Sequence, residues 1–177
     1  MVVGAQGRAE QQAQDAKNDE RCGGAGMKQP LIICGFPGVG KTSCERWARV
    51  LDAESSAYSH IFDPEKMTSR KNDEFPTNYI DMVESEMKSN RWDIILLSSH
   101  KSVRNELKLR KIKFVAVCPQ IDCLPEYLGR YLKRGSDYDF MVDIANNWFR
   151  YISDIADEEL CITLGKGQYL SDILPLF

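Results

Sequence analysis

The sequence lacks several features that would assign it to a common class of protein. No apolar run approaches the ~20 residues needed to cross a bilayer, and no apolar segment typical of a signal peptide stands near its beginning. Its 23 basic and 26 acidic side chains give a formal net charge of −3, so bulk charge does not draw it to nucleic acid. We therefore expect no membrane partner, and a nucleic-acid partner is not favoured.

Metal-binding patterns of cysteine and histidine are also missing. The chain has two histidines, no C-x-x-C pair, and cysteines at positions 22, 34, 44, 118, 123 and 161. A zinc site is therefore not expected. Cys34, Cys44, Cys118 and Cys161 fall on predicted core faces, where cysteine behaves as a small hydrophobic residue. This usage predicts a reduced, cytoplasmic protein.

Length and composition are those of an ordinary globular domain. A chain of 177 residues with 43% hydrophobic content can bury one sizeable core. Residues 1–26 are rich in Gln, Ala, Gly and mixed charge, with no periodic apolar pattern. We expect a disordered leader over 1–26 and a single domain over 27–177.

The stretch from Leu31 to Ser43, LIICGFPGVGKTS, contains the complete pattern G-x-x-x-x-G-K-[ST] between an apolar strand and a helix signal. Glycines let consecutive main-chain N–H groups turn onto phosphate oxygens, and the following helix points its positive end at them. The lysine supplies a mobile charge for the β- and γ-phosphates, and the threonine hydroxyl can ligate Mg²⁺. The residues predicted to bind ATP are Gly35, Phe36, Pro37, Gly38, Val39, Gly40, Lys41, Thr42 and Ser43.

Apolar runs alternate with helical periodicity along the rest of the chain. The runs at 92–97, 114–118 and 160–164 are typical of buried parallel strands. Apolar spacing predicts helices around 76–87, 103–107, 124–132 and 140–155. This alternation predicts an α/β fold, a parallel sheet with helices on both faces, whose ligands bind beyond the carboxyl ends of the strands.

Two segments lie between the loop and the first of these helices. Cys44, Trp47, Ala48 and Leu51 follow the spacing of one helix face, with a short extended piece at Val50–Asp52. Residues 58–74 have weak periodicity and include a proline, so we expect an irregular segment there.

Carboxylates near the second strand are candidates for chemistry. Asp52 lies just past that strand and is the first candidate to activate an acceptor or contact metal, with Glu54 second. The alternative is a solvated acidic turn capped by serines. Asp93 precedes its apolar run, whereas a metal-binding aspartate should follow it, so we interpret Asp93 as a strand-entry residue.

Polar and basic groups follow the later strands. His100 is predicted to contact substrate or to cap the next helix, and Arg104 to grip an acceptor phosphate or to carry surface charge. Arg130 and Arg134 are four apart and share a helix face. They suit a mobile basic lid that pivots at Gly135 and stabilises transition-state charge, or an ordinary solvated helix end.

The order of six segments resembles the P-loop kinases of small molecules, such as adenylate, shikimate and gluconate kinases. It resembles more closely the adenylate-kinase-like proteins of bacteriophages and bacteria. The segments are GFPGVGKTS, LDAESSAYS, EFPTNYI, DIILLSSHKSVR, EYLGRYLKRG and GQYLSDIL. The resemblance implies that 27–177 is a P-loop kinase-like domain, a three-layer P-loop NTPase sandwich. Its five-stranded parallel sheet would have the order 2-3-1-4-5, and its cofactors would be ATP and Mg²⁺.

The resemblance also implies roles for particular residues. A carboxylate after strand two contacts the acceptor, which here falls on Asp52 or Glu54, and the lid arginines fall on Arg130 and Arg134. The arginine that binds an acceptor phosphate has Arg104 as its nearest match. Residues 58–87 carry no acceptor signature of a characterised nucleotide kinase, which leaves the acceptor unidentified.

Three functions are compatible with these residues. The first is an ATP-dependent phosphotransferase acting on a nucleoside, nucleotide or similar small acceptor, with Lys41, Asp52, Arg130 and Arg134 catalytic and Thr42 and Asp52 at the metal. The second is a polynucleotide or DNA-base hydroxyl kinase. The third is a regulatory module that binds or hydrolyses a nucleoside triphosphate without an acceptor.

Overall fold

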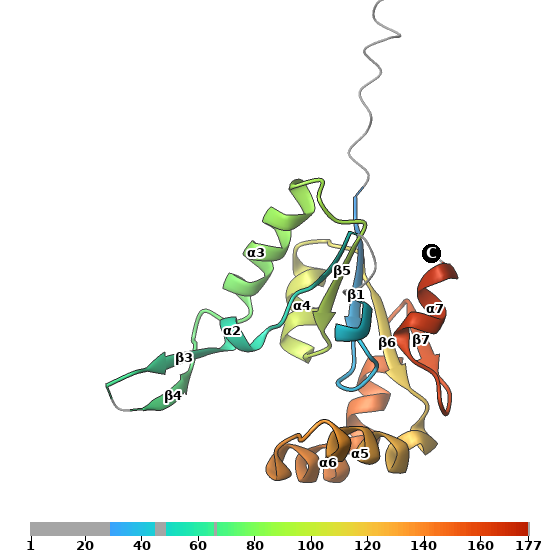
Figure 1. The fold of residues 1–177 in the computed structure, drawn as a ribbon. Coiled ribbons are helices and arrows are strands. Elements are labelled where there is room, and N and C mark those ends of the chain that lie inside the picture. The colour runs from blue at the N-terminus through green and yellow to red at the C-terminus, as the bar shows by residue number, and fades with distance from the viewer. Residues whose placement is uncertain (1–28, 45–48, 66, 177) are drawn as a thin grey trace, which may run out of the picture.

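A computed structural model describes residues 29–44, 49–65 and 67–176 (Figure 1). Its centre is a parallel sheet of β1 (Leu31–Gly35), β2 (Val50–Asp52), β5 (Ile94–Ser98), β6 (Val115–Pro119) and β7 (Cys161–Leu164). The spatial order is β2-β5-β1-β6-β7. Numbered along the chain, these five strands follow 2-3-1-4-5, so the predicted P-loop NTPase-type α/β fold is confirmed.

Two apolar clusters hold the sheet between its helices. In one cluster, Ile32 and Cys34 of β1 pack with side chains of α3 (Thr77–Lys88) and α4 (Lys101–Leu109). In the other, Ile33 packs with side chains of α5 (Leu124–Lys133), α6 (Tyr138–Ala156) and α7 (Leu170–Ile173). Alternate residues of β1 therefore point into different clusters, which explains why its sequence is continuously apolar. Each fully buried aliphatic side chain contributes about 1.5–3 kcal/mol.

The carboxyl ends of the parallel strands form one edge of the sheet, here called the carboxyl edge. Helices α5 and α6 lie at this edge, at the bottom of Figure 1. Helix α5 ends at Lys133. Two residues later φ of Gly135 is +73°, and the amide of Ser136 donates to the carbonyl of Tyr131 over 3.0 Å. This is a Schellman cap, and the predicted helix end near Gly135 is confirmed. Pivoting at Gly135 stays a prediction.

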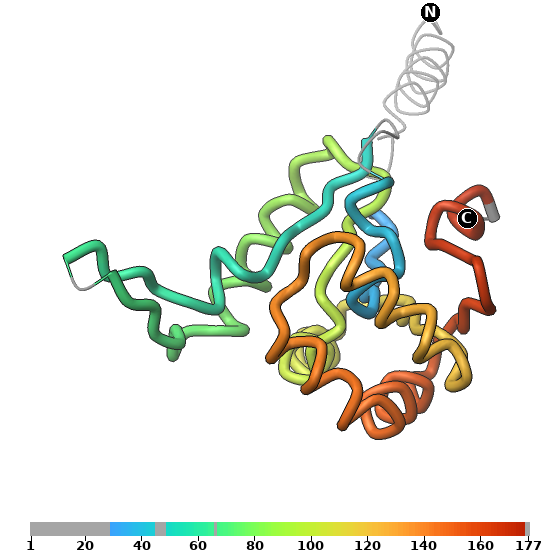
Figure 2. Tube along the Cα trace, turned by 60° about the horizontal axis from the view of Figure 1, so that its bottom comes forward, coloured from blue at the N-terminus to red at the C-terminus, as the bar shows by residue number. Residues whose placement is uncertain are grey.

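The segment predicted to be irregular contains a hairpin instead. After the short helix α2 (Ser56–Ser59), β3 (His60–Asp63) pairs antiparallel with β4 (Thr68–Lys71). This pair, here called the arm, projects from the body in both views (Figures 1 and 2). Seven of the eight strand residues are exposed, so the hairpin buries no face and leaves no apolar alternation in the sequence.

The prediction of a helix from Cys44 to Leu51 is wrong at its C-terminal end. Residues Thr42–Cys44 form a 3-10 helix, and Leu51 lies in β2, the strand that was predicted at Val50–Asp52. Trp47 and Ala48 lie outside the described residues, as do Cys22 and the predicted leader 1–26. Two further 3-10 helices are η3 (Ile121–Cys123) and η4 (Leu174–Leu176).

No disulfide joins the cysteines that the structure describes. Cys34, Cys44 and Cys118 are buried as predicted, whereas Cys161 is only partly buried and Cys123 joins the core without having been predicted there. Within the described helices, none is both long and apolar enough to span a membrane.

Candidate active site

A cavity of about 650 Å³ opens at the carboxyl edge. It is bounded by the loop after β1, by the residues that follow β2 and β5, and by the C-terminal half of α5. Predicted site residues that line it are Gly35, Pro37, Gly38, Gly40, Lys41, Thr42, Ser43, Asp52, Glu54, His100, Arg130 and Arg134. The topology therefore gathers residues from distant parts of the chain.

The phosphate loop takes backbone conformations that favour glycine. Gly38 and Gly40 have φ values of +84° and +94°, in the left-handed region that side chains disfavour. A Cβ on Gly38 would lie 2.9 Å from the Tyr131 ring. No described residue accepts a hydrogen bond from the main-chain amides of Gly38, Gly40 or Lys41, so these donors are available to an anion in the cavity.

Two of the predicted ATP-binding residues belong to the core. Phe36 is 2% exposed and makes an edge-to-face contact with Trp148, with ring centres 5.5 Å apart. Its amide donates to the carbonyl of Val117 over 2.8 Å. Val39 is fully buried, and its amide donates to the Phe36 carbonyl over 3.3 Å. The sequence pattern marks the whole loop, but the side chains of these two residues turn inward, so any contact with ATP would involve their main-chain atoms and stays a prediction.

Lys41 extends along its own loop. Its Nζ donates to the carbonyl of Gly35 over 3.0 Å. Burial lowers the pKa of Lys41, while the carboxylates of Asp52 and Glu54 act in the opposite direction. An anion in the cavity would favour the charged ammonium in the same way as these carboxylates.

Thr42 and Asp52, the predicted metal pair, are in contact. The Thr42 Oγ1 donates to Asp52 Oδ2 over 3.1 Å, and both residues line the cavity. Oxygen ligands of this kind suit Mg²⁺. The described residues contain no group of three or more His, Cys, Asp or Glu that could hold a metal. A Mg²⁺ here would therefore take its other ligands from phosphate oxygens and water, as this ion commonly does.

The side of the cavity after β2 and β5 carries Glu54, Ser98 and His100. The chain there is fixed by Tyr79, whose buried hydroxyl donates to the Ala53 carbonyl. Burial lowers the pKa of His100, the charge of Lys41 lowers it further, and Glu54 opposes both. An imidazole can accept or donate hydrogen bonds to an uncharged ligand.

Arg130 and Arg134 both line the cavity from α5, as their spacing predicted. Arg130 is held by several neighbours. It donates to the carbonyls of Gly38 and Gln168, over 2.9 and 2.8 Å. Its guanidinium also pairs with Glu126, and its Cζ lies 3.9 Å from the centre of the Tyr169 ring. Arg130 thus anchors α5 to the phosphate loop.

Arg134 is the less constrained of the two. It is exposed, donates to the Ser136 hydroxyl over 2.6 Å and lies over the Tyr131 ring. Its guanidinium has no carboxylate partner in the described chain, which leaves it able to pair with a phosphate. Tyr169, exposed beside Gly40, also lines the cavity. Sequence reasoning missed Tyr169, whose one signal is an aromatic residue after the glycine-flanked turn that follows β7.

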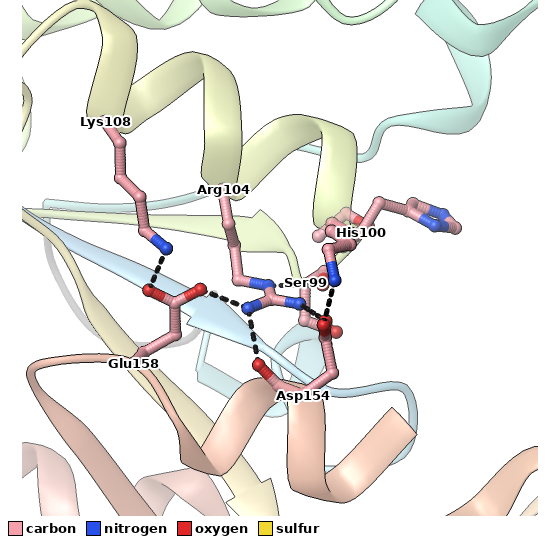
Figure 3. Close-up of polar contacts among 8 residues, drawn as sticks. Ser99, His100, Arg104, Lys108, Asp154 and Glu158 are labelled. Carbon is pink, nitrogen blue, oxygen red and sulfur yellow. Dashed lines mark hydrogen bonds and ion pairs between the residues drawn. The ribbon is translucent and has the colours of Figure 1, made fainter. Parts of the chain in front are cut away.

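Arg104 does not line the cavity, which contradicts its predicted role on an acceptor phosphate. Its side chain is 3% exposed, so it carries no surface charge either, and it forms ion pairs with Asp154 of α6 and with Glu158 just after that helix (Figure 3). Its Nε also donates to the carbonyl of Ser99 over 3.1 Å. Lys101 and Lys108 flank the cluster with further ion pairs to the same two acids. Arg104 therefore ties α4 to α6.

Asp93 lies immediately before β5, at the opposite edge of the sheet from the cavity, and pairs with Arg49 over 3.0 Å. Its interpretation as a strand-entry residue is confirmed. Ser98 occupies the other end of β5 and lines the cavity.

Comparisons with known proteins add little to this geometry. No model of a known protein family matches the sequence, and no curated protein matches it either. Among solved structures, a gluconokinase from Sinorhizobium meliloti 1021 is similar, with a TM-score of 0.46 and 16% identity. The alignment covers 84% of this chain and 89% of that one. A similarity this distant carries no functional argument, and we assign the fold from strand order.

Proposed function

We propose that this protein is a P-loop kinase that transfers the γ-phosphoryl group of ATP to a small hydroxyl or phosphate acceptor. The observation that carries the proposal is the convergence of Lys41, Thr42 and Asp52 on one cavity beside a glycine loop with available amides. The P-loop pattern of the sequence is compatible with this reaction class.

The donor end of the cavity suits a triphosphate. Amides of Gly38, Gly40 and Lys41 would bind phosphate oxygens, and the Lys41 ammonium would leave the Gly35 carbonyl for the β- and γ-phosphates. Arg134 would approach the transferred group from α5, where charge accumulates in the transition state. Arg130 would act indirectly, by holding the phosphate loop in position through its hydrogen bond to the Gly38 carbonyl.

Asp52 and Thr42 would hold Mg²⁺ with the phosphates. When bound, this ion would neutralise charge on the β- and γ-oxygens and orient them. Glu54, two residues after Asp52, lines the side of the cavity proposed for the acceptor. The Asp52 carboxylate would therefore lie between the metal ion and the acceptor. The remaining acceptor contacts would come from Glu54, Ser98 and His100.

The test is acceptor-dependent ADP formation. The full chain would be incubated with ATP, Mg²⁺ and a panel of nucleosides, nucleoside monophosphates, sugars and single-stranded DNA, with ³¹P NMR identifying the product. A new phosphoester with ADP supports the proposal. Phosphorylated DNA would favour the polynucleotide kinase alternative. Slow hydrolysis with every acceptor would reject a kinase in favour of a regulatory module.

A further inference from the structure

Charge is divided unevenly within the cavity. The lysine and arginine side chains that line it are Lys41 in the phosphate loop and Arg130, Lys133 and Arg134 on or just after α5. The opposite side, after β2 and β5, carries Asp52, Glu54, Ser55, Ser98 and His100. Among the residues the structure describes, this second side offers no lysine or arginine to the cavity.

Three basic residues of neighbouring elements do not reach this second side of the cavity. One forms ion pairs elsewhere, and two lie on the arm. Arg104 lies one helical turn after His100, but its guanidinium is buried between Asp154 and Glu158, and Figure 3 shows it turned toward α6. Arg70 and Lys71 are exposed on the arm and do not line the cavity. An acceptor phosphate on this side would therefore face the Glu54 carboxylate with no lysine or arginine of the described residues beside it.

Electrostatics then discriminates between acceptors. A phosphate monoester carries between one and two negative charges at neutral pH, and a carboxylate nearby repels it. Burial and the charge of Lys41 lower the pKa of His100, which disfavours the charged ring that could offset this repulsion. A hydroxyl group meets none of these penalties and can hydrogen-bond to Glu54, Ser98 and His100.

We infer that the acceptor is an uncharged hydroxyl compound, such as a nucleoside or a polyol, and not a phosphorylated one. This inference rests on the proposed kinase function and narrows its substrate class. Glu54 is the acceptor-side carboxylate. It hydrogen-bonds the hydroxyl and takes its proton as the acceptor oxygen bonds to the γ-phosphorus. The bond between that phosphorus and the β–γ bridging oxygen breaks, its electron pair leaves with ADP, and the products are ADP and a phosphate monoester.

The first experiment compares matched acceptors. Each nucleoside is paired with its own 5′-monophosphate, so that only the phosphate differs, and kcat/KM is measured for the full chain with ATP and Mg²⁺. The inference predicts a preference of about tenfold or more for the unphosphorylated member, the scale of bringing a like charge beside an exposed carboxylate. Equal use of both members, or a preference for the monophosphates, overturns it.

A charge reversal makes the test sharper. Glu54→Arg should lower kcat/KM for the neutral acceptor by about 100-fold or more, the scale of losing a general base, and should strengthen binding of the monophosphates about tenfold. Glu159→Arg is the matched control, because Glu159 is exposed and does not line this cavity, and it should change neither value. An unchanged acceptor preference in Glu54→Arg contradicts the inference.

The remaining outcomes separate this inference from the proposed function. If monophosphates are used and Arg70→Ser with Lys71→Ser abolishes that use, the arm binds acceptor phosphate and the inference is overturned while the kinase proposal stands. If ATP binds but no acceptor of either kind raises ADP formation, the kinase proposal fails and the inference falls with it.

Discussion

The Thr42 hydroxyl donates a hydrogen bond to the Asp52 carboxylate over 3.1 Å, joining the end of the phosphate loop to the end of β2. These residues lie ten positions apart, and strand order brings them together because β2 and β1 both end at the carboxyl edge. The contact sets two oxygen ligands beside Lys41. Its chemistry can be tested without altering the shape of the side chains.

Asp52→Asn keeps the size of the side chain and its ability to accept from Thr42, but removes its charge. Turnover should fall by about 100-fold or more, as for loss of one group that stabilises transition-state charge, while ATP affinity measured without Mg²⁺ stays close to wild type. Steady-state kinetics and calorimetry would separate the two effects. Asp73→Asn, an exposed change outside the cavity, is the control. A wild-type rate in Asp52→Asn would remove the assignment.

Gly40→Ala should disable the phosphate loop. Its φ of +94° is disfavoured for alanine, which costs about 1–2 kcal/mol, and the new Cβ would stand 3.0 Å from the Tyr169 ring. ATP affinity should fall about tenfold or more. Gly129→Ala, within α5 and with open space around its Cβ, should instead stabilise the fold by about 0.5–1 kcal/mol. Equal behaviour of the two variants in ATP titrations and thermal unfolding would argue against this account of the loop.

Arg104→Met should lower the free energy of unfolding by about 2–3 kcal/mol, because it removes charged hydrogen bonds to Asp154 and Glu158, although each acid keeps its lysine partner. The exposed pair of Arg49 and Asp93 provides the comparison, and Arg49→Met should cost no more than about 1 kcal/mol. Urea unfolding measures both. A small loss for Arg104→Met, or loss of acceptor affinity in a stably folded variant, would contradict the purely structural role.

The same cluster predicts a dependence of stability on pH. Burial opposes ionisation of Asp154, yet hydrogen bonds from Lys101 and Arg104 outweigh it, and the pKa of this carboxyl lies below its ordinary value. Below an unfolded pKa of about 3.9 the unfolded state binds more protons than the folded state. The contribution of Asp154 is thus present above about pH 4 and is lost as the pH falls through the lowered pKa. In Asp154→Asn the decline of stability below about pH 4 should be shallower; an identical slope would refute this.

The sequence alone predicted the parallel sheet with its helices and some of the residues that line the cavity. The loop pattern and the apolar runs at 92–97 and 114–118 predicted the sheet and its carboxyl edge, because doubly covered parallel strands are continuously apolar. The placement of Asp52 and Arg134 around one cavity followed from that edge. These predictions needed only local pattern and the rule that ligands bind where parallel strands end.

The features that the sequence did not predict depend on contacts between distant residues or on the directions in which side chains point. Arg104 has partners 50 and 54 positions away, which no local pattern reveals. The arm has exposed strands, so it lacks the alternation that marks a half-buried sheet. Phe36 matches the loop pattern, but the pattern does not say that its ring points into the core. Leu51 fits a helical spacing by position alone, but it lies in β2.

Calorimetric titration of ATP into Lys41→Ala tests the central claim most directly. The account predicts a loss of ATP affinity of about 100-fold or more in a variant that unfolds at a temperature close to that of wild type. Lys113→Ala, just before β6 and outside the cavity, should bind ATP as wild type does. Undiminished ATP binding by Lys41→Ala would contradict the account.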